Sequence, residues 1–388
     1  MAVAETRATL IRNPEYERNG LRSYSHAVQK YNITPTRPGQ VPLEDVEHNA
    51  LYIAEVGIGT PPQTLKLNFD TGSADTWSST WKDTAGTWKI TYGDNSEASG
   101  TVGTDNLTVG GLVVKDQAIE LATNISQAFL DNKGDGLLGL AFGSANAVKP
   151  GPVTTPVENM ILQDDIPPSA ELFTAWLGNR SEQSFFTFGY IDRHALEGKE
   201  PVYTPIDTND GFWMFESSLA SINGGYYDRS GNRAIADTGT TLCLVGDAFC
   251  ERIYGEIPGA TYNAQQQGWV FPTTTDLSTL PTVAFSIGDG LFQIKPGDFA
   301  FQDLPDGTTY GGIQSRGSQD FDVLGCVFLR CVYAIFDQGK GRFGCVQRGL
   351  PAMPVQPTPS TVTATVSSKK PRKRARFLSC CLKDDDSD

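Results

Sequence analysis

The tripeptide Asp-Thr-Gly occurs twice in this chain, at residues 70–72 and again 167 positions later at residues 237–239. In each copy an apolar run enters the aspartate, and a hydroxyl residue follows the glycine, Ser73 in the first copy and Thr240 in the second. An apolar run that stops at a carboxylate predicts a buried strand whose end presents the acid, and the glycine permits a sharp turn there. One copy alone would indicate only a local Asx-type turn. Two copies in matching context predict an imperfect duplication of the chain.

A second pair of segments supports the duplication. An apolar-apolar-Gly run follows each Asp-Thr-Gly, at residues 137–139 in the first half and at residues 323–325 in the second. We therefore expect two similar halves, each with a strand that ends at an aspartate and a later buried apolar strand. If the halves face one another, Asp70 and Asp237 meet at the floor of a cleft between them.

The composition favours a mostly β chain with two lobes. The chain has 388 residues, more than one hydrophobic core usually serves. Glycine and proline are frequent, with 40 and 23 residues, and long amphipathic helical patterns are few, which indicates many strands and turns. The formal net charge of −14 is unfavourable for a nucleic acid partner of the folded body.

The seven cysteines and three histidines predict no metal site. Their spacing includes no CxxC pair and no pattern suited to zinc, so buried free thiols are expected. A disulfide between Cys243 and Cys250 is the alternative. Residues 1–13 contain no apolar run of the secretory-signal type, and no stretch is long enough to span a membrane. Four Asn-x-Ser/Thr sequons nevertheless fit a secretory route, at Asn32, Asn106, Asn124 and Asn179.

Two carboxylates that meet in a cleft have a specific acid–base chemistry. Because like charges repel and both groups are partly desolvated, one carboxyl keeps a proton while its neighbour is anionic. The anion can take a proton from a water molecule held between them, while the neutral carboxyl donates a hydrogen bond to a carbonyl oxygen. Such a pair can hydrolyse a peptide bond without a covalent intermediate, and it requires no metal or cofactor.

The sequence resembles the pepsin-type aspartic endopeptidases of the peptidase A1 family. The resemblance rests on Asp-Thr-Gly-Ser-Ala-Asp followed by Trp77, on Tyr-Gly-Asp at 92–94, on Asp-Gly-Leu-Leu-Gly-Leu-Ala-Phe at 135–142 and on Ala-Ile-Ala-Asp-Thr-Gly-Thr-Thr at 234–241. These motifs are most similar to the fungal aspergillopepsin and penicillopepsin branch. The resemblance implies a mostly β, bilobal pepsin-like fold, in which two pseudo-twofold related lobes enclose the active-site cleft.

By this resemblance Asp70 and Asp237 are the catalytic pair. The residues expected to bind substrate are the flap tyrosine, its neighbours and the residues around the aspartates: Tyr92, Gly93, Asp94, Gly72, Ser73, Trp77, Gly239 and Thr240. In the fungal branch an acid at the position of Asp94 is associated with lysine before the scissile bond, because a carboxylate can pair with the ammonium. We therefore expect protein or peptide substrates, a broad hydrophobic preference, and acceptance of lysine at that position.

Residues 1–45 resemble a family prosegment. They are polar and mixed in charge, so a disordered leader is the alternative from composition alone. Lys30-Tyr31 resembles the Lys-Tyr or Lys-Phe pair with which family prosegments cover the catalytic carboxylates, which implies a zymogen. The N-terminal lobe is then expected at residues 46–195 and the C-terminal lobe at residues 196–349, in a monomeric enzyme.

Three positions depart from the family pattern. The stretch between Trp77 and Tyr92 lacks roughly twenty residues that typically form a strand and short helix behind the flap. Cys326 stands where most members have an aspartate after Leu-Gly, and the loss of that acid predicts a shifted pH optimum. Pro272 stands where the second cysteine of a disulfide is usual, which favours an unpaired Cys243.

Residues 350–388 lie outside the resemblance. A linker rich in Pro, Thr, Ser and Val precedes a basic run at 369–376 and the pair Cys380-Cys381. The basic run fits a nuclear-import patch, a polybasic membrane anchor with acylated cysteines, or a solvated disordered tail. The family suggests a secreted or vacuolar enzyme.

Two functional hypotheses follow from the sequence. The first is an aspartic endopeptidase made as a zymogen, favoured by the intact Asp70, Tyr92 and Asp237. The alternative is a non-proteolytic binding or accessory protein on the same bilobal fold, favoured by the short stretch behind the flap. Cleavage of a denatured protein and its sensitivity to pepstatin distinguish the two.

Overall fold

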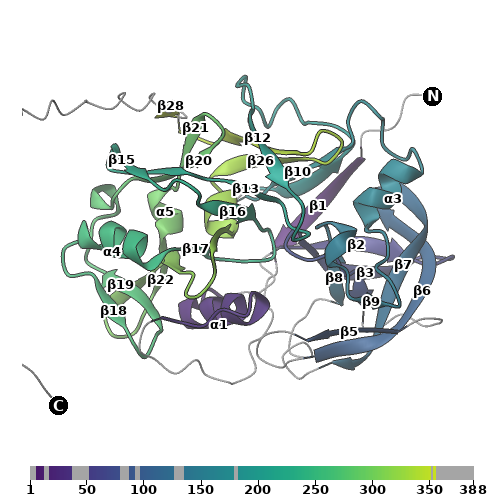
Figure 1. Cartoon of the computed structure of the whole chain (residues 1–388), viewed down its shortest axis with the longest axis horizontal. Helices are drawn as coiled ribbons and strands as arrows, with labels where there is room; N and C mark the ends of the chain where they lie inside the picture. The colour runs from purple at the N-terminus through teal and green to yellow at the C-terminus, as the bar shows by residue number, and fades with distance from the viewer. Residues whose placement is uncertain are drawn as a thin grey trace, which may run out of the picture. The chain divides into compact units, whose positions relative to one another are not determined.

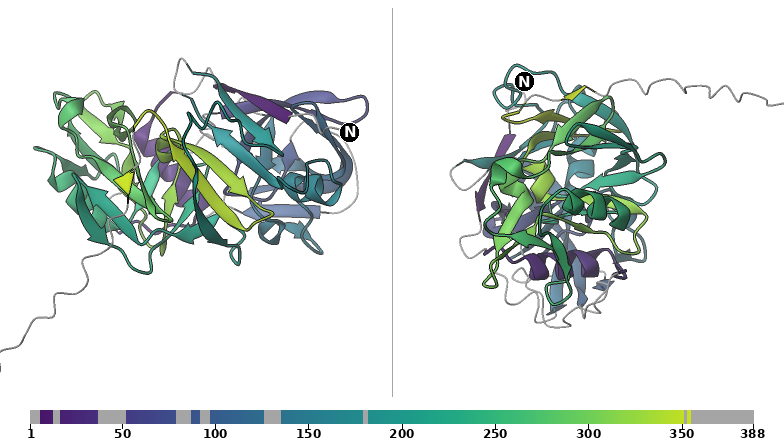
Figure 2. Two further views of the ribbon diagram at one scale, coloured as in Figure 1. Left: turned by 90° about the horizontal axis from the view of Figure 1, so that it is seen from above. Right: turned by 90° about the vertical axis from the view of Figure 1, so that its left-hand side faces the viewer.

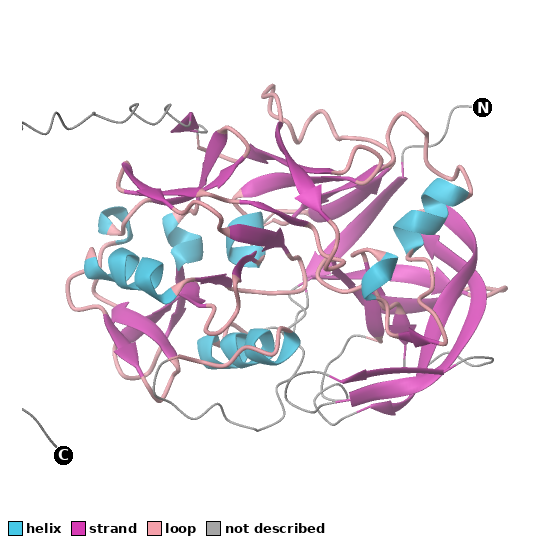
Figure 3. Ribbon diagram, viewed as in Figure 1, coloured by secondary structure: helices cyan, strands magenta, loops and turns pink. Residues whose placement is uncertain are grey.

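The computed structural model describes residues 6–12, 17–36, 52–78, 87–91, 97–125, 135–178, 182–350 and 353–354. The chain divides into a unit of residues 1–355 and a unit of residues 356–388, and every described residue belongs to the first. Strands dominate the described part, and its helices are short (Figure 3). The mostly β expectation is thus confirmed. The predicted basic run and Cys380-Cys381 lie outside the described residues.

The first half of the fold is built around the β6–β7 hairpin. These two strands pair antiparallel from Ala98↔Ile125 to Val109↔Leu112. The elements of this half are β1 (Thr6–Arg12), α1 (Gly20–Lys30), β2 (Tyr52–Ile58), β3 (Gln63–Asp70), β4 (Trp77–Ser78), β5 (Thr87–Thr91), β6 (Glu97–Val109), β7 (Leu112–Ile125), β8 (Gly136–Gly139), η1 (Gly143–Ala145), β9 (Val148–Lys149), α3 (Pro156–Leu162), β10 (Leu172–Trp176) and β11 (Ser184–Phe188).

The second half consists of short strands with small helices between them. Its elements are β12 (Val202–Asp207), β13 (Met214–Glu216), β14 (Leu219–Ile222), β15 (Gly225–Asp228), β16 (Arg233–Ala236), β17 (Cys243–Val245), α4 (Asp247–Gly255), β18 (Thr261–Asn263), β19 (Gly268–Pro272), η2 (Leu277–Thr279), β20 (Val283–Ile287), β21 (Gly290–Gln293), α5 (Pro296–Phe299), β22 (Ala300–Asp303), β23 (Thr308–Gly311), β24 (Ile313–Ser315), β25 (Phe321–Leu324), α6 (Cys326–Leu329), β26 (Val332–Asp337), β27 (Arg342–Gln347) and β28 (Met353–Pro354). No helix in the described part is long and apolar enough to cross a membrane.

The predicted repeat is present in the strand pairing. β3 runs parallel to β8 with Asp70 opposite Gly139, and β16 runs parallel to β25 with Ala236 opposite Leu324. A short strand then returns antiparallel to the apolar strand of each half, β4 beside β8 and β17 beside β25. Each Asp-Thr-Gly therefore leaves the end of a strand that is flanked by the apolar-apolar-Gly segment predicted to accompany it.

One set of paired strands joins the two halves. β1 pairs with β11, β11 with β10, β10 with β26, β26 with β27, and β27 with β12. Figure 1 shows β10, β12 and β26 between the strands of the first half, on the right, and α4, β18 and β22, on the left. Phe173 of β10 stacks on Phe336 of β26 with ring centroids 4.6 Å apart. Burial of each such ring stabilises the fold by about 1.5–3 kcal/mol. Both rings belong to one cluster of buried side chains with members in both halves, so the core is continuous between the halves.

The predicted leader, residues 1–45, contributes a strand and a helix to this unit. β1 pairs with both β11 and β2, while α1 lies below the strands of the second half (Figures 1 and 2). The boundary predicted after residue 195 falls between β11 and β12 and stays a prediction, and residues 45–46 lie outside the described part. The five cysteines in the described residues are all buried, and none of them is in a disulfide, so Cys243 and Cys250 are not bonded to each other.

Candidate active site

The two aspartates occupy equivalent turns. Asp70 ends β3, and Asp237 directly follows β16. Both are buried, with 2 % and 0 % of their surface exposed. The Gly72 N–H donates to Asp70 Oδ1 and the Gly239 N–H donates to Asp237 Oδ1, each at 2.9 Å. Each turn thus uses its own glycine amide to hold one carboxylate oxygen, which favours the ionised form.

The glycines are required by the close approach of the turns. Neither has a positive φ, so backbone freedom is not the reason for glycine here. A Cβ on Gly72 would lie 2.6 Å from the Asp237 carboxyl group, and a Cβ on Gly239 would lie 2.2 Å from Asp70 Oδ1. Both distances are far inside van der Waals contact. The expected sharp turn is present, but the deciding constraint comes from the opposite half of the chain.

Thr71 and Thr238 link the two turns by reciprocal hydrogen bonds. The Thr71 N–H donates to Thr238 Oγ1 at 3.1 Å, and the Thr238 N–H donates to Thr71 Oγ1 at 2.9 Å. The Thr71 hydroxyl also donates to the Ala236 carbonyl at 2.9 Å, and the Thr238 hydroxyl donates to the Phe69 carbonyl at 2.6 Å. Each hydroxyl therefore accepts from and donates to the opposite half. No spacing or periodicity in the sequence indicates this exchange, because its partners are 167 residues apart.

Lys30 lies between the two carboxylates. Its Nζ is 2.8 and 3.0 Å from the oxygens of Asp70 and 3.2 and 3.0 Å from those of Asp237. The Lys30 side chain is 8 % exposed. Lys30 is the last residue of α1, where the helix dipole also favours a cation. The helix thus delivers one ammonium group to a site that already holds two acids.

Tyr31 enters the same site from the end of α1. Its hydroxyl donates to Asp237 Oδ2. Its ring contacts Phe212 and Phe321 edge-on, with centroid separations of 6.2 and 6.0 Å, and the Gln319 side-chain amide donates to its carbonyl. The phenol is therefore enclosed by aromatic rings on one side and a carboxylate on the other. No spacing or periodicity in the sequence indicates Phe212, Phe321 or Gln319, because each is far from Tyr31 along the chain.

The two acids have pKa values shifted in opposite directions. Burial raises the pKa of Asp70 to about 6; the Lys30 ammonium opposes this shift and the Asp237 charge adds to it. Burial also acts to raise the pKa of Asp237, but Lys30 and hydrogen bonds, including that from Tyr31, hold it below the usual range. The two carboxylates in turn raise the pKa of Lys30 against its burial. Asp237 is therefore the anionic partner and Asp70 the partner that keeps a proton more readily.

Comparisons with known proteins assign this geometry to a family. The family model described as eukaryotic aspartyl protease matches residues 51–77 and 78–348. Aspergillopepsin-1 from Aspergillus fumigatus is 36 % identical over 355 residues, which cover 85 % of this chain and 87 % of that protein. The chain belongs to the eukaryotic aspartyl protease family. It is an aspartic endopeptidase, a hydrolase of peptide or protein substrates, as the sequence motifs predicted.

Other relatives agree with this family assignment. Penicillopepsin-1 from Talaromyces stipitatus is 38 % identical over 311 residues, covering 76 % of this chain and 77 % of that protein. Endothiapepsin from Cryphonectria parasitica is 34 % identical over 375 residues, covering 84 % and 86 %. The crystal structure of an aspartic proteinase from Irpex lacteus superposes with a TM-score of 0.65 at 26 % identity, covering 76 % of this chain and 94 % of that one. The bilobal pepsin-like fold is confirmed by this similarity.

The other residues predicted from the aspartyl protease motifs lie at separate places around the two aspartates or outside the described residues. The Ser73 hydroxyl donates to Asp70 Oδ2 at 2.7 Å. Thr240 is fully buried and lowers the pKa of Asp237 together with Lys30. Trp77 is buried and stacks on Trp88 of β5, with ring centroids 6.3 Å apart, so it supports that strand from behind. Tyr92, Gly93 and Asp94 lie between β5 and β6, outside the described residues.

Cys326 lies beside the Asp237 turn. It begins α6, is 2 % exposed, and its thiol donates to the Thr238 carbonyl at 3.3 Å. Burial raises the pKa of this thiol to about 12, with the charge of Asp237 adding to the shift. The thiol is therefore neutral where the family pattern has an acid. Among the residues that the structure describes, no group of three or more His, Cys, Asp or Glu side chains is placed to hold a metal.

Proposed function

We propose that Asp70 and Asp237 activate a water molecule between them for peptide-bond hydrolysis. The observation that carries the proposal is the position of Lys30 Nζ, which lies within 3.2 Å of all four carboxylate oxygens. A water molecule at that point, after Lys30 has left, is within reach of both acids. The Asp237 anion takes its proton, and protonated Asp70 donates to the carbonyl oxygen of the scissile bond. In the closed chain the pKa of Asp70 is raised, and that of Asp237 is lowered by Lys30 and hydrogen bonds, which gives the direction of these roles. After Lys30 has left, the repulsion between the two buried acids still keeps one carboxyl neutral and the other anionic.

We also propose that the chain is a zymogen in which residues 1–45 are the inhibitory segment. Lys30 occupies the space of the water molecule, and Tyr31 fills the adjoining space next to Phe212 and Phe321. A second contact, remote from the acids, also anchors the segment, because Arg18 Nη1 donates to the Phe301 carbonyl at 2.9 Å. Substrate and leader therefore compete for one site, and hydrolysis requires release of the leader.

The specificity proposal rests on the same site. The ring of Tyr31 supports a preference for large hydrophobic side chains in the space next to Phe212 and Phe321. Acceptance of lysine before the scissile bond is proposed from Asp94 in the sequence motif alone. Asp94→Ser should lower kcat/KM for peptides with lysine before the scissile bond. It should leave kcat/KM unchanged for peptides with phenylalanine at that position. From the family resemblance we also propose a monomeric enzyme. From the charge of the basic run at 369–376 we propose a membrane or import contact.

The activity is tested by incubating the full chain with a denatured protein between pH 3 and 6, with and without pepstatin. Cleavage that pepstatin abolishes, together with loss of the leader, is expected. Asp70→Asn should lower the rate by about 10⁴-fold, the upper range for removal of an acid–base group. Cleavage that survives either pepstatin or Asp70→Asn would show that another group performs the reaction.

A further inference from the structure

A second pair of acids is buried in the first half of the fold, outside the cleft. Asp75 lies in the segment between β3 and β4, five residues after Asp70, and Glu120 lies on β7. They are 2 % and 1 % exposed. β4 and β7 pair in parallel with Trp77 opposite Glu120, and the Glu120 N–H donates to the Thr76 carbonyl at 2.9 Å. The backbone thus brings two sequence-distant carboxyl groups into one buried space.

The hydrogen bonds around these acids leave one oxygen without a donor. Asp75 Oδ1 accepts from the Ala147 N–H at 2.8 Å, and Glu120 Oε1 accepts from Asn146 Nδ2 at 2.8 Å. Glu120 Oε2 is buried, and no donor group of the described residues reaches it. Each of the two acids is among the groups that shift the pKa of the other, so their carboxyl groups are neighbours. A proton held between the two carboxyl groups satisfies the remaining oxygen, because two carboxylates cannot donate to each other.

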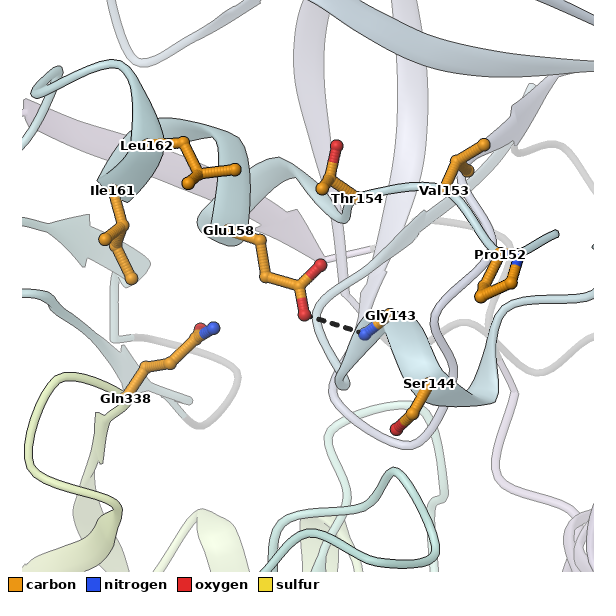
Figure 4. A pocket seen from close by; sticks show the side chains of 9 residues that line it. All are labelled: Gly143, Ser144, Pro152, Val153, Thr154, Glu158, Ile161, Leu162 and Gln338. Atoms are coloured by element: carbon orange, nitrogen blue, oxygen red, sulfur yellow. Dashed lines mark hydrogen bonds between the residues drawn. The ribbon is translucent and has the colours of Figure 1, made fainter.

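Glu158 on α3 provides a contrast. Its Oε1 accepts from the Gly143 N–H at 2.9 Å, the bond drawn in Figure 4, and its Oε2 accepts from the Thr155 N–H at 2.8 Å. Both oxygens therefore have backbone donors, and the ionised form is satisfied. Burial raises the pKa of Glu120 to about 9, with the Asp75 charge adding to the shift, and burial also raises the pKa of Asp75. Glu158 thus has a donor for each carboxylate oxygen, whereas Glu120 has a donor for only one of them within the described residues.

The groups of the described residues that face the pair are neutral. From the segment after η1 they are the Asn146 amide and the Ala147 N–H, and from the residue before β4 the Thr76 backbone. From α3, Asn159 donates to Gln117 of β7 at 2.8 Å, while Glu158 faces η1. Within the described residues no cation is among the groups that shift the pKa of either acid. A negative charge on both acids would therefore be uncompensated.

The pair is attached to two parts of the active-site half. Asn146 Nδ2 also donates to the Ala74 carbonyl, 3.2 Å away, immediately after the Asp70 turn. Asn146 Oδ1 accepts from the Val148 N–H at 3.0 Å, and Val148 lies opposite Trp88 in the pairing of β9 with β5. Glu120 and Asp75 therefore hold Asn146 and Ala147, and these two residues lie between the Asp70 turn and the strand pair of β9 and β5.

We propose that Asp75 and Glu120 share one proton in the folded enzyme and form a proton-dependent latch between the Asp70 turn and β5. Loss of this proton at alkaline pH opens the first half and inactivates the enzyme, and the cause is ionisation of this pair and not titration of Asp70 or Asp237. The proposal goes beyond the proposed hydrolysis and does not depend on the zymogen.

The direction of the pH effect follows from linkage. The folded chain keeps one proton on the pair up to about pH 9, whereas an unfolded glutamate loses its proton near pH 4.3. Folding therefore takes up one proton between about pH 5 and pH 9. The stabilisation is complete below this range, and the folding equilibrium constant falls about tenfold for each unit that the pH rises within it.

The test compares Glu120→Gln with Glu158→Gln in the full-length chain, both in an Asp70→Asn background that prevents self-cleavage. Urea unfolding is followed by tryptophan fluorescence from pH 5 to pH 9. Glutamine at position 120 can donate to Asp75 and does not titrate, so the pH dependence of stability should lose the equivalent of one proton. Glu158→Gln should leave that dependence unchanged. Equal pH slopes for Glu120→Gln and the background, or equal changes for both variants, would overturn the latch.

Two further measurements cover a variant that fails to fold. Asp75→Asn provides the same loss of a titrating group from the other side of the pair. Infrared spectroscopy of the Asp70→Asn background should show the C=O band of a buried carboxylic acid at pH 7 that disappears at alkaline pH. Absence of this band at pH 7 would contradict the shared proton. With Asp70 present, Glu120→Gln should also retain activity at pH 5 after incubation at pH 9 better than the unaltered enzyme, and equal losses would count against the latch.

Discussion

The Asp70 turn and the Asp237 turn have equivalent backbones but give their carboxylates different neighbours. Both receive a glycine amide bond, and both contact Lys30. Asp70 has in addition the Ser73 hydroxyl, whereas Asp237 has the Tyr31 hydroxyl. Their pKa values are shifted in opposite directions. The duplication thus determines where the acids lie, and residues outside the repeated tripeptide determine which acid holds the proton.

The largest expected effect comes from removing the cation that the two acids share. Lys30→Met leaves two buried carboxyl groups without their ammonium, and loss of one partner of a buried ion pair costs about 3–5 kcal/mol. We expect the leader to be released about 10³-fold more readily, so that the variant cleaves a peptide substrate at pH 5–6. Release is measured by the N-terminal sequence of the chain over time.

The unaltered chain provides the pH reference for this variant. Since Asp237 has a lowered pKa in the closed form, its contribution to closure is present above the usual aspartate pKa, about 3.9, and is lost as pH falls below it. The raised pKa of Asp70, about 6, acts in the opposite sense, and its contribution to closure is lost as the pH rises through 6. The unaltered chain should therefore be latent near pH 5 and activate below about pH 4. Arg22→Met removes a charge two turns earlier on α1, about 12 Å away along the helix, and serves as control. Equal latency of Lys30→Met and Arg22→Met would show that Lys30 does not hold the leader in the site.

The second effect tests the closeness of the two turns. Gly72→Ala would displace Asp237, and Gly239→Ala would displace Asp70, because the added Cβ atoms meet the opposite carboxyl groups. A displacement of about 1 Å can cost about 10²-fold in rate, so both variants should lose activity to that degree. Gly151→Ala, with no atom within 4 Å of its Cβ, is the control. Full activity of either turn variant would show that the turns can separate freely.

The third effect concerns the neutral thiol beside the Asp237 turn. Cys326→Asp places an acid where the family pattern has one, and a nearby like charge disfavours ionisation of the pair. The acid-side limb of the kcat/KM profile against pH should rise by about one unit. Cys326→Ser keeps the position neutral and should leave the limb in place. A profile that is the same for Asp and Cys would remove Cys326 as the cause of a shifted optimum.

The smallest effect comes from the Tyr31 hydroxyl. Tyr31→Phe keeps the ring between Phe212 and Phe321 and removes only the bond to Asp237. The same Asp237 oxygen keeps its bond from Lys30, so the loss should be that of an ordinary hydrogen bond, about 0.5–1.5 kcal/mol. The rate of leader release should therefore rise by up to about tenfold. The half-time of leader loss at pH 4 measures it. Tyr52→Phe, whose hydroxyl donates to Gly178, controls for loss of a buried phenol hydroxyl. Slower release from Tyr31→Phe than from the unaltered chain would contradict the closed site described here.

Much of the fold was predictable because its signals are local and repeated. The apolar run before each aspartate and the later apolar-apolar-Gly segments mark β3, β8, β16 and β25, and the family resemblance pointed to Lys30. The contacts that the sequence did not indicate join distant segments. The exchange between Thr71 and Thr238 spans 167 residues, and the contact of Tyr31 with Gln319 spans 288. Such pairs have no shared periodicity or spacing, so only the folded chain brings them together.

The hydrogen-bond exchange between Thr71 and Thr238 also has a mechanical consequence. Its four bonds all join one half to the other at the level of the carboxylates. A rotation of one half against the other therefore has its pivot at the acids, where displacement is smallest, and its largest amplitude at the rim of the cleft. The ends of a long peptide would then move with the rim, while the scissile bond keeps its position between Asp70 and Asp237. The enzyme can in this way admit bulky chains without losing the alignment of the two acids.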